Sequence, residues 1–252
     1  MSSILGVPVD AAYHLVSGFT TVLTPVLGGL AAVAAIVLFT AAARLILMPL
    51  SLRGLRGQAT QARLAPQLQD LRKRYAKQPE RLQREMTALY KREGTSMFAG
   101  LTPLLLQWPL LSVMYLLFRS TQIGGKANTL LTHDLFGVPL GSHWLAGAGA
   151  VSMHGLVFLG VFALLAGLCW LSVRLGRLMT AQPAGADAPG GALIRVLPYL
   201  TVVIAAFAPL AAGIYLLTSL AWSLAERKFF WPSAAASAVP EAPVSKRTVK
   251  AR

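Results

Sequence analysis

The sequence predicts an all-α, polytopic membrane protein with five transmembrane helices and a cytoplasmic antiparallel helical hairpin. Three observations support this fold class. Hydrophobic residues make up 55% of the 252 residues, and the mean hydropathy is +0.60. Only 13% of the residues are charged, whereas a soluble domain carries about 25%. The apolar residues form runs long enough to cross a bilayer, with basic residues in blocks between them.

The runs divide the chain into spans and connecting segments. A Gly-, Ala- and Pro-rich stretch at 181–191 separates the third span from the fourth, and Pro209 separates the fourth from the fifth in a tight helical hairpin. The predicted organisation is an external N-terminal segment (1–25), a first span (26–52), the cytoplasmic hairpin (53–97), a second span (98–119), an external loop (120–150), a third span (151–173), a cytoplasmic loop (174–191), a fourth span (192–207), a fifth span (209–226) and a basic cytoplasmic tail (227–252).

The distribution of basic residues predicts the orientation. Segment 1–25 has no Lys or Arg, loop 51–97 has 11, and region 119–150 has two. Region 174–195 adds three, and the tail after Trp222 adds six. Cytoplasmic loops are enriched in Lys and Arg. We therefore expect a multi-pass protein of the plasma (inner) membrane with its N-terminus outside and its C-terminus in the cytoplasm.

The 53–97 segment shows two matched apolar stripes. Helical spacing places four residues on one face of the first half and three on one face of the second: Leu64, Leu68, Leu71 and Tyr75, then Leu82, Met86 and Leu89. Pro79 stands at a first-turn position and Gly94 where a C-cap belongs. The stripes predict two helices that face each other, mobile relative to the spans, with the tip able to rest on the membrane surface. The alternative is a solvated charged linker.

The first span contains a full positive charge, Arg44. A charge at that depth is costly, about 2.5–3.5 kcal/mol on insertion scales. No Asp or Glu lies inside a span, and only Glu226, at the cytoplasmic end of the fifth, could approach Arg44. Two interpretations remain open. The side chain extends to the cytoplasmic headgroups, or it points into a water-filled cavity between helices.

Polar residues at helical spacing favour the cavity. Thr40, Arg44 and Ser51 lie on one face of the first span. The second span contributes one amide, Gln107. The fifth span has its own polar stripe: Tyr215, Thr218, Ser219, Trp222 and Ser223. Each of these alone is more often an interhelical hydrogen bond than a site, but around a cation they predict a hydrated pocket.

No catalytic residue, metal site or cofactor is expected. Cys169 stands alone inside an apolar run, so the chain has neither a disulfide framework nor a metal-binding set. The four histidines show no ligand spacing: His14, His133, His143 and His154. The N-terminus lacks a positive region, so we expect no cleaved signal peptide, and no lipid-anchored Cys follows it.

Three motifs carry a family resemblance. They are "RLILMPL" (44–50), "LAPQLQDLRKRYAKQPERLQREMTALYKREG" (64–94) and "GLTPLLLQWPLLSVMYLLFR" (100–119). In this order they resemble the membrane protein insertases of the YidC/Oxa1/Alb3 family. The specific features are an Arg five residues before Pro-Leu, a Pro-led hairpin that ends in "LYKREG", and Gly-x-x-Pro-x-x-x-Gln-x-Pro. The match is weaker over 193–226, and the third span matches only in position.

The resemblance implies a five-span core with a groove open to the cytoplasm and the lipid. The groove's Arg corresponds to Arg44, and its polar neighbours to Thr40, Gln107, Tyr215 and Ser219. In the family this client-binding groove takes up the hydrophilic segment of a membrane protein while the client's apolar helix slides into the bilayer. The implied partners are nascent membrane protein clients and the lipid bilayer. We expect the short form of the family, without a large external domain or an additional N-terminal anchor.

Some positions depart from the family pattern. Ser96-Met97 replaces Asn-Pro after the hairpin Gly, Leu216 replaces an aromatic residue, and Leu220 replaces an Asn. Ala225-Glu226 stands where the family has a Gln pair. The fifth-span side of the groove is therefore less polar than usual, which bears on the range of clients.

Other functions are weighed against an insertase. A small transporter or channel could use Arg44 to bind an anionic solute, but it would need gates or internal repeats, which the sequence lacks. A lipid-modifying enzyme would need a nucleophile–base pair or metal motif near the cytoplasmic face. A relative that assembles complexes without inserting clients remains an alternative. The basic hairpin and tail could contact ribosomal RNA or serve topology alone, and a Sec translocon is a further candidate partner.

Overall fold

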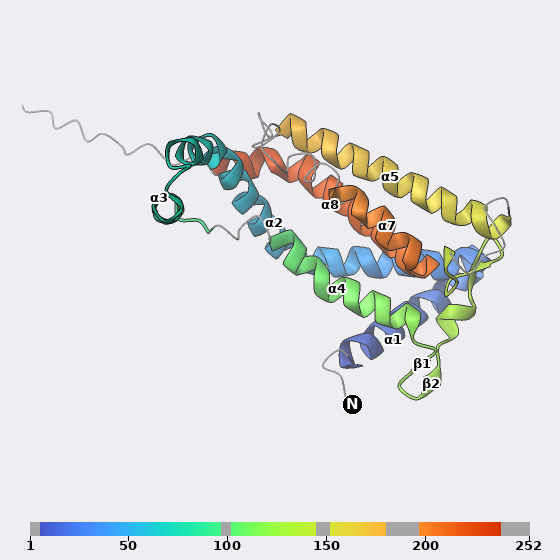
Figure 1. The fold of residues 1–252 in the computed structure, drawn as a ribbon. Helices are drawn as coiled ribbons and strands as arrows, with labels where there is room; N and C mark the ends of the chain where they lie inside the picture. The colour runs from blue at the N-terminus through green and yellow to red at the C-terminus, as the bar shows by residue number, and fades with distance from the viewer. Residues whose placement is uncertain (1–5, 97–101, 145–151, 180–196, 238–252) are drawn as a thin grey trace, which may run out of the picture.

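Helices form all the long elements in the part of the chain that is described. The computed structural model describes residues 6–96, 102–144, 152–179 and 197–237. Its elements, shown in Figure 1, are the helices α1 (Gly6–Leu27), α2 (Ala31–Arg74), α3 (Pro79–Arg92), α4 (Thr102–Arg119), α5 (Met153–Met179), α7 (Leu200–Phe207) and α8 (Leu210–Ser237), and the 3-10 turns η1 (Gly28–Leu30), η3 (Thr129–Thr132) and η5 (Leu197–Tyr199).

Most of the segment 1–25, which was expected to be external, forms the helix α1, which the sequence pattern did not predict. In α1, Val9, Ala12 and Val16 are buried at helical spacing against the core. The α1 helix packs on α2 and α4, and a turn at Gly28, with φ of +53°, reverses the chain into α2. Positive φ costs glycine little because it has no Cβ.

The first predicted span and half of the hairpin are one continuous helix. With 44 residues, α2 is about 66 Å long at 1.5 Å per residue. The hydrocarbon core of a bilayer is about 30 Å thick. If the N-terminal part of α2 crosses a membrane, its C-terminal part therefore extends well beyond the bilayer.

The end of α2 packs against α3. Leu64, Leu89 and Tyr90 are buried, and Leu68, Leu71 and Met86 pack around them. Arg63 pairs with Glu93, and Gln61 Nε2 donates to the carbonyl oxygen of Ser96 at 3.3 Å. Within the part of α2 that meets α3, the earlier residues Gln61 and Arg63 thus contact the last residues of the α3 segment, which is an antiparallel arrangement. Pro79 begins α3, and Gly94 follows its end with φ of +61°.

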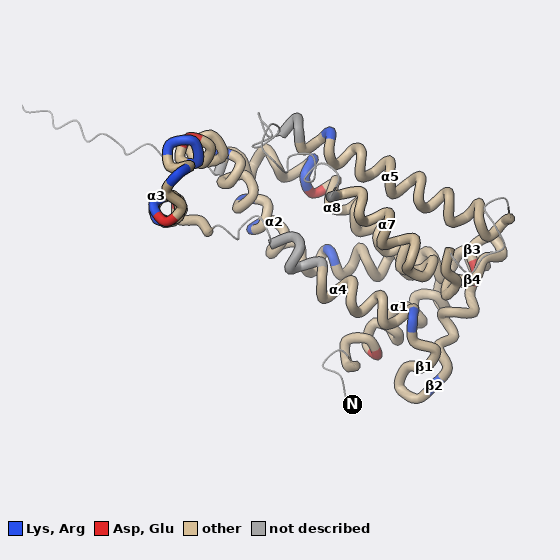
Figure 2. The backbone as a smooth tube through the Cα atoms, in the orientation of Figure 1, with Lys and Arg blue, Asp and Glu red and all other residues tan. Residues whose placement is uncertain are grey.

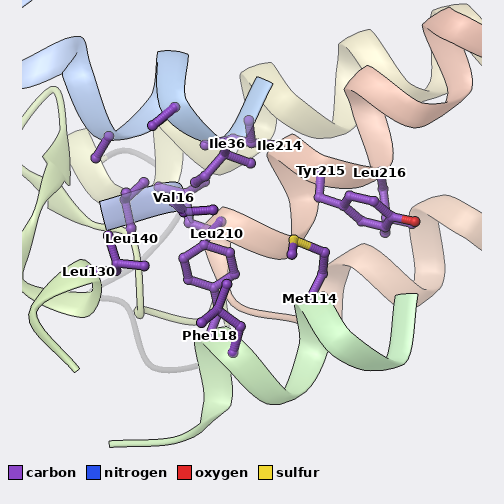
Figure 3. Packing of buried hydrophobic residues seen from close by; sticks show 14 of the residues in the cluster. Val16, Ile36, Met114, Phe118, Leu130, Leu140, Leu210, Ile214, Tyr215 and Leu216 are labelled. Carbon is purple, nitrogen blue, oxygen red and sulfur yellow. The ribbon is translucent and has the colours of Figure 1, made fainter. Parts of the chain in front are cut away.

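The main apolar core lies at the other end of the molecule. It gathers side chains from α1, α2, α4, α5, α7 and α8 (Figure 3). Met114 and Phe118 from α4 meet Leu210 and Tyr215 from α8 in this cluster. Four buried residues of the loop between α4 and α5 join it: Ile123, Leu130, Val138 and Leu140.

That loop closes the end of the bundle through backbone groups. It contains two short antiparallel hairpins, β1 (Gln122–Ile123) with β2 (Lys126–Ala127) and β3 (Asp134–Leu135) with β4 (Val138–Pro139). The buried Asn128 side chain donates to the carbonyl oxygens of Leu117 and Ser120 at the end of α4. The Leu210 and Ala211 N–H groups that begin α8 donate to carbonyls of the same loop. The loop thus satisfies the free ends of two helices.

The fourth and fifth predicted spans correspond to two helices joined at Pro209. The described part of the fourth is η5 and the eight-residue α7, and residues 192–196 lie outside the described residues. The fifth is α8, which continues 11 residues past the predicted boundary at 226 to Ser237. This extension packs on α2: Leu55, Ala59 and Ala234 are buried, with Phe230 and Trp231 beside them.

The outer faces of the helices are apolar. Val26 is 82% exposed and Ile46 78% exposed, and further large apolar side chains face outward on α1, α2, α5 and α7. Within the described residues, two stretches are long and apolar enough to cross a membrane, 6–74 and 153–176, and Trp108–Arg119 is a shorter apolar helix. Such faces suit contact with lipid rather than water. This is the exterior expected of an all-α membrane protein.

Candidate functional site

Arg44 lies between α2 and α8. Arg44 is only 7% exposed, and its guanidinium donates a hydrogen bond to the Ser219 hydroxyl. A side chain that extended to the lipid headgroups would not be enclosed in this way. The structure therefore favours the interhelical position over the headgroup position.

The other predicted residues surround the same place to different degrees. Thr40, one turn before Arg44, is buried and donates its hydroxyl to the Ile36 carbonyl at 2.7 Å. Tyr215, one turn before Ser219, is fully buried in the apolar core. Gln107 belongs to α4, but its side chain lies outside the described residues. Arg44 and Ser219 thus meet across the α2–α8 pair, and Thr40 and Tyr215 stand one turn before them on the same two helices.

The two helices run parallel in a regular register. Arg44 contacts Ser219, and Ser51 donates to the Glu226 carboxylate, so both contacts join residues 175 positions apart. The contacts are seven residues apart on each helix, about two turns or 10 Å. Next along α2, Gln58 accepts a hydrogen bond from Arg227 at 3.1 Å. We call this line of contacts the polar seam, and define it as Arg44, Ser219, Ser51, Glu226, Gln58 and Arg227.

Glu226 makes contacts that the sequence did not predict. It was expected only as a residue that could approach Arg44. The structure buries it to 6% exposure, and its two oxygens accept from Ser51 and from Trp222 Nε1, the latter at 2.7 Å. The signal was present in the sequence because Ser51 and Trp222 belong to the two polar stripes. What the sequence lacked was the register between α2 and α8.

The hydroxyls of two members of the fifth-span stripe bond within α8 rather than to α2. The Thr218 hydroxyl donates to the Ile214 carbonyl at 2.9 Å, and the Ser223 hydroxyl to the Ser219 carbonyl at 3.0 Å. Bonds of this kind satisfy a hydroxyl within its own helix. Spacing alone could not separate these residues from Ser219.

The polar seam consists of hydrogen-bonding and charged groups. Among the described residues, no three His, Cys, Asp or Glu side chains gather as they would around a metal ion. The seam instead presents hydroxyl, guanidinium, carboxylate and amide groups between two otherwise apolar helices. Groups of this kind attract polar or charged segments of a partner where the surroundings have a low dielectric constant.

Comparison with known proteins gives consistent matches. The chain is similar to the membrane protein insertase YidC of Clostridium tetani, with 35% identity over 114 residues, 45% of this chain and 52% of the relative. The Clostridium perfringens insertase is 35% identical over 114 residues, which are 45% of this chain and 48% of that protein. The Helicobacter pylori J99 insertase is 35% identical over 102 residues, 40% of this chain and 19% of the relative. The matches thus span about half or less of the relatives' lengths.

The family comparison covers more of the chain. The sequence pattern of the 60Kd inner membrane protein family matches residues 22–233, which include α2, the hairpin, α4, α5, α7 and most of α8. Both helices of the polar seam lie inside the matched region. The chain therefore belongs to the 60Kd inner membrane protein family, the YidC/Oxa1 family.

Proposed function

We propose that this protein is a membrane protein insertase and chaperone that helps integral membrane proteins enter and fold in the bilayer. Family membership and the similarity to membrane protein insertases support this proposal. The observation that carries it is Arg44, a cation enclosed between two helices whose outer faces are apolar. A charge at membrane depth is costly, and the charged residues found there usually mark functional sites.

The proposed binding groove consists of Arg44, Thr40, Gln107, Tyr215 and Ser219. A client's hydrophilic segment enters from the cytoplasm and is attracted by the Arg44 charge, while its apolar helix passes along the outer faces of α2 and α8. Water and polar groups in such a groove lower the barrier to moving a polar segment through hydrocarbon. The enclosed position of Arg44 and its contact with Ser219 support this arrangement.

The proposed topology has five spans in the plasma (inner) membrane, an external N-terminus and a cytoplasmic C-terminus. The family name supports an inner membrane. Lys and Arg gather around α3 and the nearby ends of α2 and α8 (Figure 2), and few lie at the opposite end. Because cytoplasmic segments are enriched in basic residues, this distribution supports a cytoplasmic hairpin. Its basic surface is also the proposed contact for ribosomal RNA, and a Sec translocon is a further proposed partner.

Reconstitution tests the function. Purified protein in liposomes, without a translocon, should insert a short single-span client that carries an acidic external segment. Arg44→Ala should reduce that insertion about ten-fold or more, since it removes the attracting charge. Arg44→Lys should retain much of the insertion activity, because the proposed attraction depends on the positive charge rather than on the guanidinium geometry.

The controls separate folding from function. Thr218→Ala changes a hydroxyl on α8 that bonds within its own helix, so it should insert the client as wild type does. Thermal unfolding should show that Arg44→Ala still folds. Equal insertion by Arg44→Ala and wild type would refute the groove mechanism for these clients.

A further inference from the structure

Glu226 places a negative charge in the polar seam. The residue is 6% exposed, and hydrogen bonds from Ser51 and Trp222 reach both of its oxygens. An ionised carboxylate is purely an acceptor, so two converging donors suit it. A carboxylate is seldom buried without such partners.

Its position is fixed relative to Arg44. The contacts at Ser219 and Glu226 are seven residues apart on α8, or about 10 Å along the helix. The direction from Arg44 to Glu226 is also the direction in which α2 continues toward α3. A segment that reaches Arg44 from the basic end of the molecule therefore passes Glu226 first. Arg227, beside it, is directed to Gln58 on α2.

We propose that Glu226 is a specificity-determining residue of the client site, which weakens the preference of the Arg44 groove for acidic segments and admits segments that carry Lys or Arg. The inference rests on the proposed insertase function. With Arg44 alone, the seam would favour acidic clients. With Glu226 two turns away, the seam holds one anion beside the two cations Arg44 and Arg227, so each client charge meets both attractive and repulsive groups.

The size of the effect follows from Coulomb's law. A unit charge about 10 Å away, at an effective dielectric constant between those of water and the protein interior, changes binding about three-fold. Screening by salt reduces this value where the seam is open to solvent. Two charges on the client should enlarge it.

The experiment compares two clients that differ only in their external segment, one with two Asp and one with two Lys. Insertion of each is measured in liposomes for wild type, Glu226→Gln and Glu226→Asp. Glu226→Gln should raise the ratio of acidic to basic client inserted by about three-fold or more. Glu226→Asp keeps the charge and should leave the ratio near that of wild type.

The remaining variants separate charge from structure. Glu226→Met, a second neutral variant, should change the ratio in the same direction as Glu226→Gln, because an apolar isostere often replaces a buried charge at little cost. Thr218→Ala should leave the ratio unchanged. A ratio that stays the same in both neutral variants, with both clients still inserted, overturns the role of Glu226 alone. Failure of wild type to insert either client overturns the proposed function itself.

Discussion

At the scale of single residues, the contact between Arg44 and Ser219 decides how the charge is accommodated. A guanidinium removed from water needs acceptors, and leaving a charged donor unsatisfied costs more than a lost neutral hydrogen bond. Ser219 is 1% exposed and supplies such an acceptor from the facing helix. Thr40 beside Arg44 donates to its own helix. The Ser219 hydroxyl on α8 thus helps to stabilise the buried Arg44 guanidinium.

Ser219→Ala should therefore destabilise the protein by roughly 1–3 kcal/mol. The substitution removes a hydrogen bond to a charged group without changing the packing volume much. The free energy of unfolding in detergent, measured by denaturant titration, checks this value. Ser223→Ala is the matched control, because that hydroxyl bonds within α8 and its loss should cost less than about 0.5 kcal/mol. Equal losses in the two variants would show that Ser219 does not hold Arg44.

At the scale of elements, the periodicity of apolar residues predicted the contacts between helices that are adjacent in the sequence. The stripe of Leu64, Leu68 and Leu71 does face the stripe that holds Met86 and Leu89. Tyr90, outside both stripes, joins that cluster because it is next to Leu89 on the inner side of α3. Pro79 and Gly94 mark the limits of α3 as their chemistry requires.

Periodicity could not predict elements that are stabilised by distant chain segments. The burial of one face of α1, the continuation of α8 to Ser237 and the bonds of Glu226 all depend on partners far along the chain. Arg44 could be proposed as a site residue from the sequence because a cation in an apolar run is rare. The register that pairs Ser51 with Glu226 needed the structure.

The ion pair at the base of the hairpin makes its packing sensitive to acid. Arg63, which donates to Glu93, holds the pKa of that carboxyl below its ordinary value of 4.5, aided by Arg92. A lowered folded-state pKa means that the pair stabilises the hairpin above about pH 4.5 and is lost as the pH falls through the folded pKa. We therefore expect the packing to weaken and the α2–α3 separation to vary more as the pH falls below 4.5.

Spin labels measure that separation. Labels at the exposed positions Gln67 and Gln83, in a Cys169→Ala background, report the distance between the two helices as the pH is lowered. The distance distribution should broaden below pH 4.5 in the parent protein. In Glu93→Gln the distance distribution should already be broad at pH 7 and should change less with pH. Any change that remains in this variant comes from the titration of other carboxylates such as Glu80. A parent distribution that stays narrow to pH 3 would contradict the role of the ion pair.

At the scale of the whole molecule, the two ends differ in a way that suits one-sided access. The end with the short strands is closed by Leu130, Val138 and Leu140 and by backbone bonds to the start of α8. The polar seam runs from Arg44 away from that closure toward the basic end, where α3 lies (Figures 1 and 2). The polar contacts between α2 and α8 therefore lie on the basic side of the apolar closure, as the proposed entry of clients from that end requires.

This polarity fixes an orientation that can be measured. Two exposed lysines form a matched pair, Lys77 in the turn before α3 and Lys126 in β2. Replaced singly by Cys in a Cys169→Ala background, position 126 should react with a membrane-impermeant maleimide on intact cells. Position 77 should react only after the membrane is opened or inverted, because the eleven basic residues between 51 and 97 favour a cytoplasmic location of that segment. Reaction of position 77 on intact cells would reverse the orientation, and clients would then reach Arg44 from outside rather than from the ribosome's side.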